Sequence, residues 1–145
     1  MVRSAGILLS RRGGAEVLLG HMGGPFWARR EERAWSIPKG EIDRAESDLE
    51  AAVREFGEEL GIPVPDAPYR PLGEFRQRSG KVVVVFHAEA DLDVSKAVST
   101  RFELEWPPRS GRLQSVPELD RIRWVPVAEA RRLLVAGQVP VLDAL

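Results

Sequence analysis

Residues 40–62 read GEIDRAESDLEAAVREFGEELGI, and this stretch contains a clear helix signal. Ser47 is a favoured N-cap residue, and Glu50 three positions later completes the pattern of a capping box. Gly61 ends the helix, because glycine readily adopts the left-handed backbone angles that are common just beyond a helix C-terminus. The sequence therefore predicts a helix over residues 47–60.

The predicted helix has an apolar face and an acidic face. Its apolar residues follow helical spacing and are expected to be buried: Leu49, Val53, Phe56 and Leu60. A different face carries three glutamates at spacings of three and four: Glu55, Glu58 and Glu59. Such neighbours repel each other, at a cost of a few tenths of a kcal/mol per exposed pair. The acidic face is therefore either a solvated surface, which is the usual explanation of a charge run, or a site for a hard divalent cation.

The spacing around the helix decides between these two interpretations. Five residues separate Gly40 from Glu46, and seven more precede Arg54 and the three glutamates. This order resembles the Nudix box, whose pattern is G, five residues, E, seven residues, R-E-U-x-E-E-x-G-U, where U is a bulky apolar residue. All seven specified residue types are present, which happens by chance about once in 10⁸ windows. The departures are Phe56, where an aliphatic residue is commoner, and Ala45, where many members have glycine.

The resemblance implies a fold and an activity. It implies a single Nudix hydrolase domain, MutT-like, over residues 1–145. The implied fold class is α/β (α+β), an α/β/α sandwich around a mixed β-sheet. The implied function is metal-dependent hydrolysis of a phosphoanhydride bond in a nucleoside di- or polyphosphate derivative, with dinucleoside polyphosphates ahead of nucleoside triphosphates. The alternative is a non-catalytic Nudix-like module that senses a nucleotide, although such modules typically lose box glutamates and this chain keeps them.

The resemblance also implies roles for the charged residues of the box. Glu55 and Glu59 are expected to be direct ligands of Mg²⁺ or Mn²⁺, with Glu58 a third ligand or the general base. Glu46 and Arg54 are expected to orient these carboxylates, because the rigid guanidinium fork of arginine can bridge them. Glu55 remains a second candidate for the base, since the glutamate that accepts the proton differs among Nudix enzymes.

Many Nudix members recruit a further carboxylate from a segment far along the chain. The best candidate here is the predicted strand 102–106, in which alternation places Glu103 and Glu105 on one face and the apolar residues on the other. An edge strand with a solvated face explains the same pattern equally well. We expect Glu103, rather than Glu105, to complete the metal site.

Four residues are candidates for binding the substrate. Lys39 directly precedes the box and suits a phosphate contact as a point charge, and Gly40 fits a position of close approach. The run WSIPK over residues 35–39 resembles the version found in dinucleoside-polyphosphate and diphosphoinositol-polyphosphate members. Arg109 and Arg112 stand in a proline-rich loop, where they are either further phosphate contacts or simply solvated.

Composition excludes several other kinds of site. The chain has no cysteine and two histidines, so thiolate chemistry and a zinc site built from several histidines are excluded. We expect His21 and His87 to be packing or surface residues. Any metal must have oxygen ligands, which favours Mg²⁺ or Mn²⁺. With 21 basic and 22 acidic residues there is no basic excess, so we expect a small nucleotide substrate and no nucleic acid partner.

The rest of the chain predicts a layered fold and, separately, a cytoplasmic location. Apolar runs and alternation predict six strands: 4–9, 17–20, 72–78, 81–90, 102–106 and 122–125. A second helix is predicted over residues 127–135, which together with the first indicates a mixed α/β or α+β arrangement. The chain has neither signal-peptide order nor an apolar stretch of membrane-spanning length, so we expect a cytoplasmic protein without a membrane partner. The resemblance also allows a homodimer.

Overall fold

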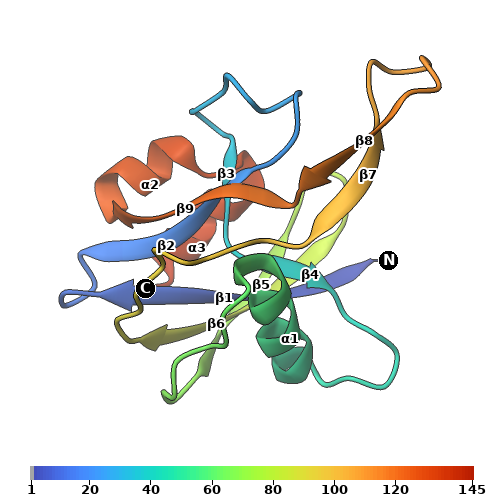
Figure 1. The fold of residues 1–145 in the computed structure, drawn as a ribbon. Helices are drawn as coiled ribbons and strands as arrows, with labels where there is room; N and C mark the ends of the chain where they lie inside the picture. The colour runs from blue at the N-terminus through green and yellow to red at the C-terminus, as the bar shows by residue number, and fades with distance from the viewer. Residues whose placement is uncertain (1) are drawn as a thin grey trace.

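A mixed sheet with helices on both faces forms the centre of the computed structural model, which describes residues 2–145 (Figure 1). The main path of the sheet has the strand order β3-β2-β1-β6-β5, and β4 and β9 pair with β1 and β2. These strands are β1 (Arg3–Arg11), β2 (Glu16–Met22), β3 (Trp35–Ser36), β4 (Lys39–Glu41), β5 (Arg70–Arg76), β6 (Val82–Glu89) and β9 (Leu119–Pro126). The predicted fold class is thereby confirmed.

Three helices cover the two faces of the sheet. They are α1 (Asp48–Leu60), α2 (Val127–Leu133) and α3 (Val139–Asp143), with a short 3-10 turn, η1 (Ala136–Gln138), before α3. Apolar residues of α1 pack on one face of the sheet, and those of α2 and α3 pack on the other. None of the helices in the described chain is long and apolar enough to cross a lipid bilayer.

The central strands β1 and β6 run parallel and are buried on both faces. Their register extends from Arg3 opposite Val82 to Ser10 opposite Glu89. Alternate residues of β1 face opposite layers, so Ile7 packs on the α1 side while its neighbour packs on the side of α2 and α3. The run Val82–Phe86 is buried throughout, as its unbroken apolar character predicts.

The helix α1 has the predicted caps but a different buried face. The Ser47 side chain accepts a hydrogen bond from the Glu50 backbone N–H, the Glu50 side chain accepts one from Ser47, and Gly61 has a left-handed φ of 69°. The predicted apolar stripe is wrong at Val53, which is 36% exposed. The helix is rotated so that Ala52 and Glu59 face inward instead, which places one glutamate of the acidic face in a buried position.

Several elements differ from the predicted ones. The strands β3 and β4 have two and three residues, too short for a periodic signal. The predicted strand 102–106 is present as β7 (Arg101–Glu105), but it pairs only with β8 (Leu113–Pro117) in a separate ribbon that projects from the body (Figure 1). β8 was not predicted because Val116 is its single buried residue. The predicted helix 127–135 ends earlier, at Leu133.

Candidate active site

A cavity of about 390 Å³ gathers the acidic residues of α1 at one end of the sheet. Glu55, Glu58 and Glu59 line it from the helix, and Glu118 joins them from the connection between β8 and β9. Two positive side chains, Lys39 and Lys81, line the same cavity from β4 and from the residue before β6; the remaining lining residues are Val2, Ser4, Gly40, Glu41 and Thr100. The cavity is therefore acidic on the side of the helix and carries lysines among the strands.

Position 40 requires glycine because the carboxylate of Glu55 lies close to its Cα atom. Strand β4 pairs antiparallel with β1, with Gly40 opposite Ala5, and α1 packs beside it. A Cβ atom at Gly40 would lie 2.0 Å from the carboxyl carbon of Glu55. Glycine at this position of the box therefore leaves the space that the Glu55 carboxylate occupies.

Glu59 is a buried carboxylate without a strong partner. It is 8% exposed, and the backbone N–H of Lys39 donates its hydrogen bond over a long 3.4 Å. Burial raises the pKa of Glu59 to about 8, and the positive charge of Lys39 opposes this only in part. A buried carboxyl group that lacks a counter-ion is stabilised by a cation placed beside it.

The pKa values of two other carboxyl groups in the cavity are also raised. Burial is the main cause that raises the pKa of Glu55, where repulsion from Glu58 and Glu118 adds to it and Arg54 opposes it. Burial likewise raises the pKa of Glu118, opposed by the charge of Lys39. The cavity thus favours either protons or an external cation on its glutamates.

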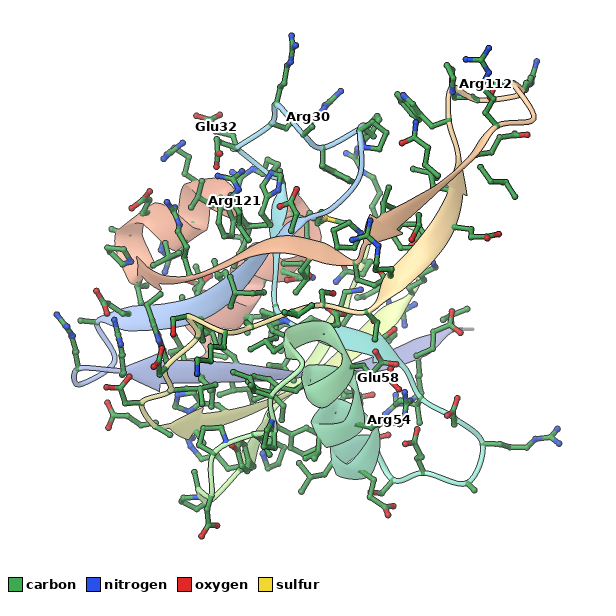
Figure 2. All side chains as sticks on the ribbon, in the orientation of Figure 1. Arg30, Glu32, Arg54, Glu58, Arg112 and Arg121 are labelled. Atoms are coloured by element: carbon green, nitrogen blue, oxygen red, sulfur yellow. The ribbon has the colours of Figure 1, made fainter. Side chains whose placement is uncertain are left out.

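Arg54 holds the outer glutamates with its guanidinium group. Its Nε and Nη2 donate to the two carboxylate oxygens of Glu46 at 2.6 and 2.9 Å, a bidentate pair. Its Nη1 donates to Glu55 at 2.8 Å and to Glu58 at 3.3 Å. The hydrogen bonds to Glu46 are the largest cause that raises the pKa of Arg54. Figure 2 shows Arg54 and Glu58 beside each other on α1.

The donor set of the cavity fits a hard divalent cation. Within residues 2–145, no three acidic or histidine side chains already form a group that could hold a metal ion. The carboxylates of Glu55 and Glu58 instead accept hydrogen bonds from Arg54, and Glu59 accepts one from the Lys39 N–H. The buried carboxyl group of Glu59, whose charge Lys39 offsets only in part, and the other glutamates of the cavity nevertheless suit an ion bound through oxygen atoms alone, as Mg²⁺ and Mn²⁺ are.

Comparison with known proteins gives the family. A family model described as NUDIX domain matches residues 1–145. The chain belongs to the NUDIX family. Members of this family generally use divalent metal ions.

Individual relatives resemble this Nudix chain to different extents. The RNA pyrophosphohydrolase of Thioalkalivibrio sulfidiphilus is 32% identical over 105 residues, which cover 69% of this chain and 61% of that protein. A crystal structure of a C. elegans Ap4A hydrolase in a binary complex has a TM-score of 0.65 at 22% identity, covering 99% of this chain and 94% of that one. The NUDIX domain of Shewanella oneidensis NrtR, complexed with ADP ribose, has a TM-score of 0.63 at 17% identity, covering 99% and 85%.

The similarity to solved structures and the similarity to curated sequences differ in what they show. The structural neighbours, at identities below a quarter, show the Nudix fold. The chain spans between 32% and 61% of the length of the curated RNA pyrophosphohydrolases that it matches.

Several predicted site residues lie outside the Nudix cavity. Glu103 is on the exposed face of β7 and does not line the cavity. Glu105 accepts hydrogen bonds from the backbone N–H groups of Arg109 and Gly111, so it caps the hairpin loop. Figure 2 shows Arg112 at the tip of the β7–β8 ribbon, away from Glu58. The structure does not bring Glu103, Arg109 or Arg112 to the box glutamates, and their roles stay predictions.

Glu118 is the carboxylate that the sequence analysis missed. It stands in the sequence VPELD, between β8 and β9, where neither helical nor strand spacing singles it out. Its place in the cavity depends on how β9 pairs with β2, a contact between residues far apart in the chain.

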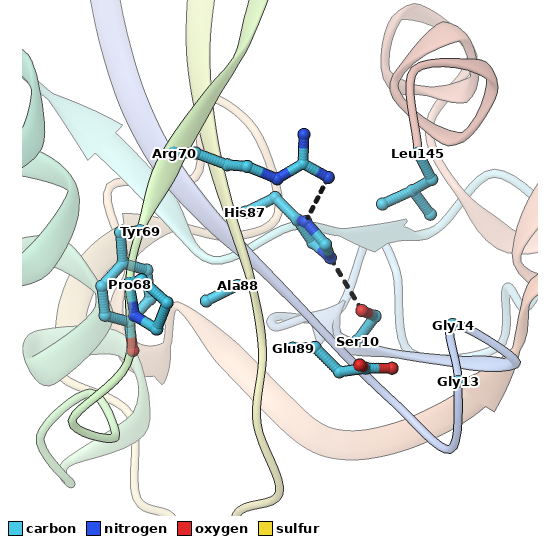
Figure 3. Close-up of a pocket in the computed structure, with 10 residues that line it drawn as sticks. All are labelled: Ser10, Gly13, Gly14, Pro68, Tyr69, Arg70, His87, Ala88, Glu89 and Leu145. Carbon is cyan, nitrogen blue, oxygen red and sulfur yellow. Dashed lines mark hydrogen bonds between the residues drawn. The ribbon is translucent and has the colours of Figure 1, made fainter.

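A larger cavity of about 530 Å³ lies elsewhere in the molecule and contains none of the predicted catalytic, metal-binding or substrate-binding residues (Figure 3). In it, Arg70 lies 3.4 Å from Nδ1 of His87, and Nε2 of His87 lies 2.7 Å from the Ser10 hydroxyl. Burial, and then the charge of Arg70, lower the pKa of His87. Glu89 is its single acidic residue, so this cavity offers no set of oxygen ligands for a divalent cation.

Proposed function

We propose that this chain is a pyrophosphohydrolase that uses Mg²⁺ or Mn²⁺ to cleave a phosphoanhydride bond in a nucleoside di- or polyphosphate derivative. The observation that carries the proposal is the convergence of Glu55, Glu58, Glu59 and Glu118 on one cavity, where Lys39 offsets the charge of the buried Glu59 only in part. A structural domain gains no stability from such a cluster, because buried carboxylates without partners are costly.

Most charged residues of the cavity have a task in this proposal. Glu55, Glu59 and Glu118, with or without Glu58, would hold the cation. When bound, the cation would neutralise phosphate charge and orient the anhydride for attack by water. Lys39 and Lys81 supply positive charge from the strands to the remaining phosphate oxygens.

Glu58 is the glutamate best placed to act as the general base. Its side chain is 46% exposed, against 15% for Glu55, so water reaches it more easily. Arg54 holds it at 3.3 Å, longer than its 2.8 Å contact with Glu55, so Glu58 is the less tightly bound of the two. In this arrangement Glu58 accepts the proton that the attacking water loses.

Two substrate classes contain the required bond. The sequence around Lys39 favours a dinucleoside polyphosphate, and a structural neighbour is an Ap4A hydrolase. The triphosphate end of an RNA is the second candidate, because the curated relatives are RNA pyrophosphohydrolases. The formal net charge of −1 favours the small substrate, since binding to a polymer backbone usually uses a basic excess.

A panel assay tests the proposal. Phosphate and nucleotide release would be measured with Mg²⁺ and with Mn²⁺ on dinucleoside polyphosphates, nucleoside triphosphates, ADP-ribose and an RNA bearing a 5′-triphosphate. We expect turnover of at least one substrate and its complete loss in excess chelator. Nucleotide binding without turnover of any of them would contradict the proposal and favour the nucleotide-sensing alternative.

The fourth carboxylate can be identified with two matched substitutions. We expect Glu118→Gln to lower kcat/KM by about 10–100-fold or more, a loss at least as large as that for residues that only orient a metal ligand. Glu103→Gln removes the same charge from the exposed ribbon and should leave activity unchanged. Steady-state kinetics on both variants decide the assignment, and the opposite order of effects would restore Glu103 as the fourth ligand.

The raised pKa values predict how stability depends on pH. Glu59 has a pKa of about 8 in the fold against an ordinary value of 4.5, so between these values the folded state binds more protons than the unfolded state. The melting temperature of the chelated protein should therefore fall as pH rises from about 5 to about 9. Mg²⁺ binds the ionised form, so the rise in melting temperature that it produces should grow over the same range.

Two controls belong to this measurement. Potassium at matched ionic strength reports screening alone, which does not depend on the identity of the ion. Glu59→Gln removes the group with the largest shift and should flatten the pH dependence in chelator. An equal response to potassium and Mg²⁺ at every pH would show that the glutamates bind no cation.

A further inference from the structure

The segment that carries Glu118 passes through an irregularity in the pairing of β2 with β9. Along these strands Gly20 pairs with Ile122 and His21 with Arg121, but Met22 pairs with Leu119. Asp120 is therefore an extra residue on β9, which makes a β-bulge. Bulges re-aim side chains and are common beside active sites.

This bulge determines which way Glu118 points. Successive side chains of a strand face opposite sides, so a shift of one residue would exchange the directions of Glu118 and Leu119. In the observed register Leu119 is buried against the core beneath α1, and Glu118 lines the catalytic cavity. Without the bulge, the carboxylate would face the core and the leucine would face the cavity.

The bulge is held by a buried histidine. His21 is fully buried, its Nδ1 lies 2.7 Å from an oxygen of Asp120, and its Nε2–H donates to the carbonyl oxygen of Arg30 at 2.6 Å. A carbonyl oxygen can only accept, so Nε2 carries the proton of the bond to Arg30, and the Asp120 carboxylate lies against the other ring nitrogen. The ring thus ties the extra residue of β9 to the loop after β2 through two short hydrogen bonds.

We propose that His21 and Asp120 are positioning residues that hold this bulge and so direct Glu118 into the catalytic cavity. The inference rests on the proposed function, because it gives Glu118 the role of a metal ligand.

Close backbone contacts transmit the position of the bulge to the cavity. The Gly23 N–H donates to the Glu118 carbonyl oxygen at 3.0 Å, and a Cβ atom on Gly23 would lie 1.9 Å from the Pro117 carbonyl oxygen. The Glu118 N–H donates to the backbone carbonyl oxygen of Thr100 at 2.9 Å, and the Thr100 N–H donates to the backbone carbonyl oxygen of Glu58 at 3.0 Å. Movement at the bulge would therefore displace Glu118 relative to the glutamates of α1.

Three variants test the proposal. His21→Phe keeps the ring volume and removes both hydrogen bonds, and Asp120→Ala removes the bond to the bulge. Asp120→Asn should preserve the geometry, because its amide can donate to Nδ1 of a neutral ring while Nε2–H still reaches Arg30. We expect His21→Phe and Asp120→Ala to weaken Mn²⁺ binding and to lower kcat by about 10-fold or more, with Asp120→Asn close to the unsubstituted protein.

The second histidine provides a matched control. His87 is also buried and hydrogen-bonded, but it lies in the cavity of Figure 3, which contains none of the glutamates of the catalytic cavity. His87→Phe should leave Mn²⁺ affinity unchanged even if it lowers the melting temperature. If His21→Phe fails to fold, the difference in Mn²⁺ affinity between Asp120→Ala and Asp120→Asn still tests the positioning role. Unchanged Mn²⁺ affinity in Asp120→Ala would overturn the proposal.

Mn²⁺ binding, measured by calorimetry, separates this inference from the proposed function. If the unsubstituted protein binds Mn²⁺ but hydrolyses nothing, the proposed function fails and the affinities of the variants still test the positioning role. If Glu118→Gln binds Mn²⁺ as tightly as the unsubstituted protein and keeps its turnover, Glu118 is not a ligand. The positioning role is then refuted while hydrolysis by the box glutamates stands.

Discussion

Replacing Glu59 with glutamine is expected to lower turnover by several orders of magnitude and to leave the fold intact. The carboxylate is buried beside Lys39 with one long hydrogen bond. Its negative charge therefore contributes little to the stability of the fold but can bind a cation. Glutamine has nearly the same shape but cannot neutralise a cation. The neutral amide also removes a buried ionisable group, so the melting temperature in chelator at neutral pH should be unchanged or higher.

The measurement combines kinetics with a test of folding. Turnover would be followed at saturating Mg²⁺, and circular dichroism and thermal melting in chelator would show whether the variant is folded. A folded Glu59→Gln variant with turnover near that of the unsubstituted protein would refute the role of Glu59 as a ligand. A variant that melts much earlier in chelator would instead show that the charge of Glu59 stabilises the fold.

Replacing Gly40 with alanine is expected to cost about 10²-fold in kcat/KM, the order of loss that a displacement of about 1 Å can cause in an active site. The added Cβ would lie 2.0 Å from the carboxyl carbon of Glu55. The atoms that it meets are the end of a flexible side chain, so the carboxylate moves and the backbone keeps its place. Activity should therefore fall much more than stability.

Gly57 offers a control within the same box. It lies inside α1, and a Cβ atom there would meet nothing within 4 Å. Gly57→Ala should keep full activity and stabilise the protein by about 0.5–1 kcal/mol, because glycine is unfavourable inside a helix. Kinetics and thermal melting on the two variants form the comparison, and equal losses of activity in both would contradict the role assigned to Gly40.

The features that the sequence predicts well have local causes. The capping box of Ser47 and Glu50 and the stop at Gly61 depend on residues three or four positions apart, so the ends of α1 could be predicted. The family was evident from the spacing of the box alone and is confirmed by the family model. The buried character of Val82–Phe86 was equally plain from an unbroken apolar run.

The features that it predicts poorly depend on contacts between distant segments. Val53 fits the apolar stripe by spacing, but the packing of α1 turns Ala52 and Glu59 inward instead. Glu103 satisfies strand alternation, yet its strand joins a ribbon outside the main sheet. Glu118 has no periodic signal, because a bulge between two strands far apart in the sequence determines its direction.

The central position of β1 has a consequence for the order of folding during synthesis. β1 leaves the ribosome before its parallel partner β6, which begins at Val82, so one edge of the strand lacks its neighbour until the residues between the two strands have been made. Such non-local pairing slows folding, since chain entropy is lost before the contacts form. The glutamate helix is complete before β6 and Glu118 are translated. We therefore expect nascent chains that stop before β6 to be unable to assemble the catalytic cavity and to depend on protection from aggregation.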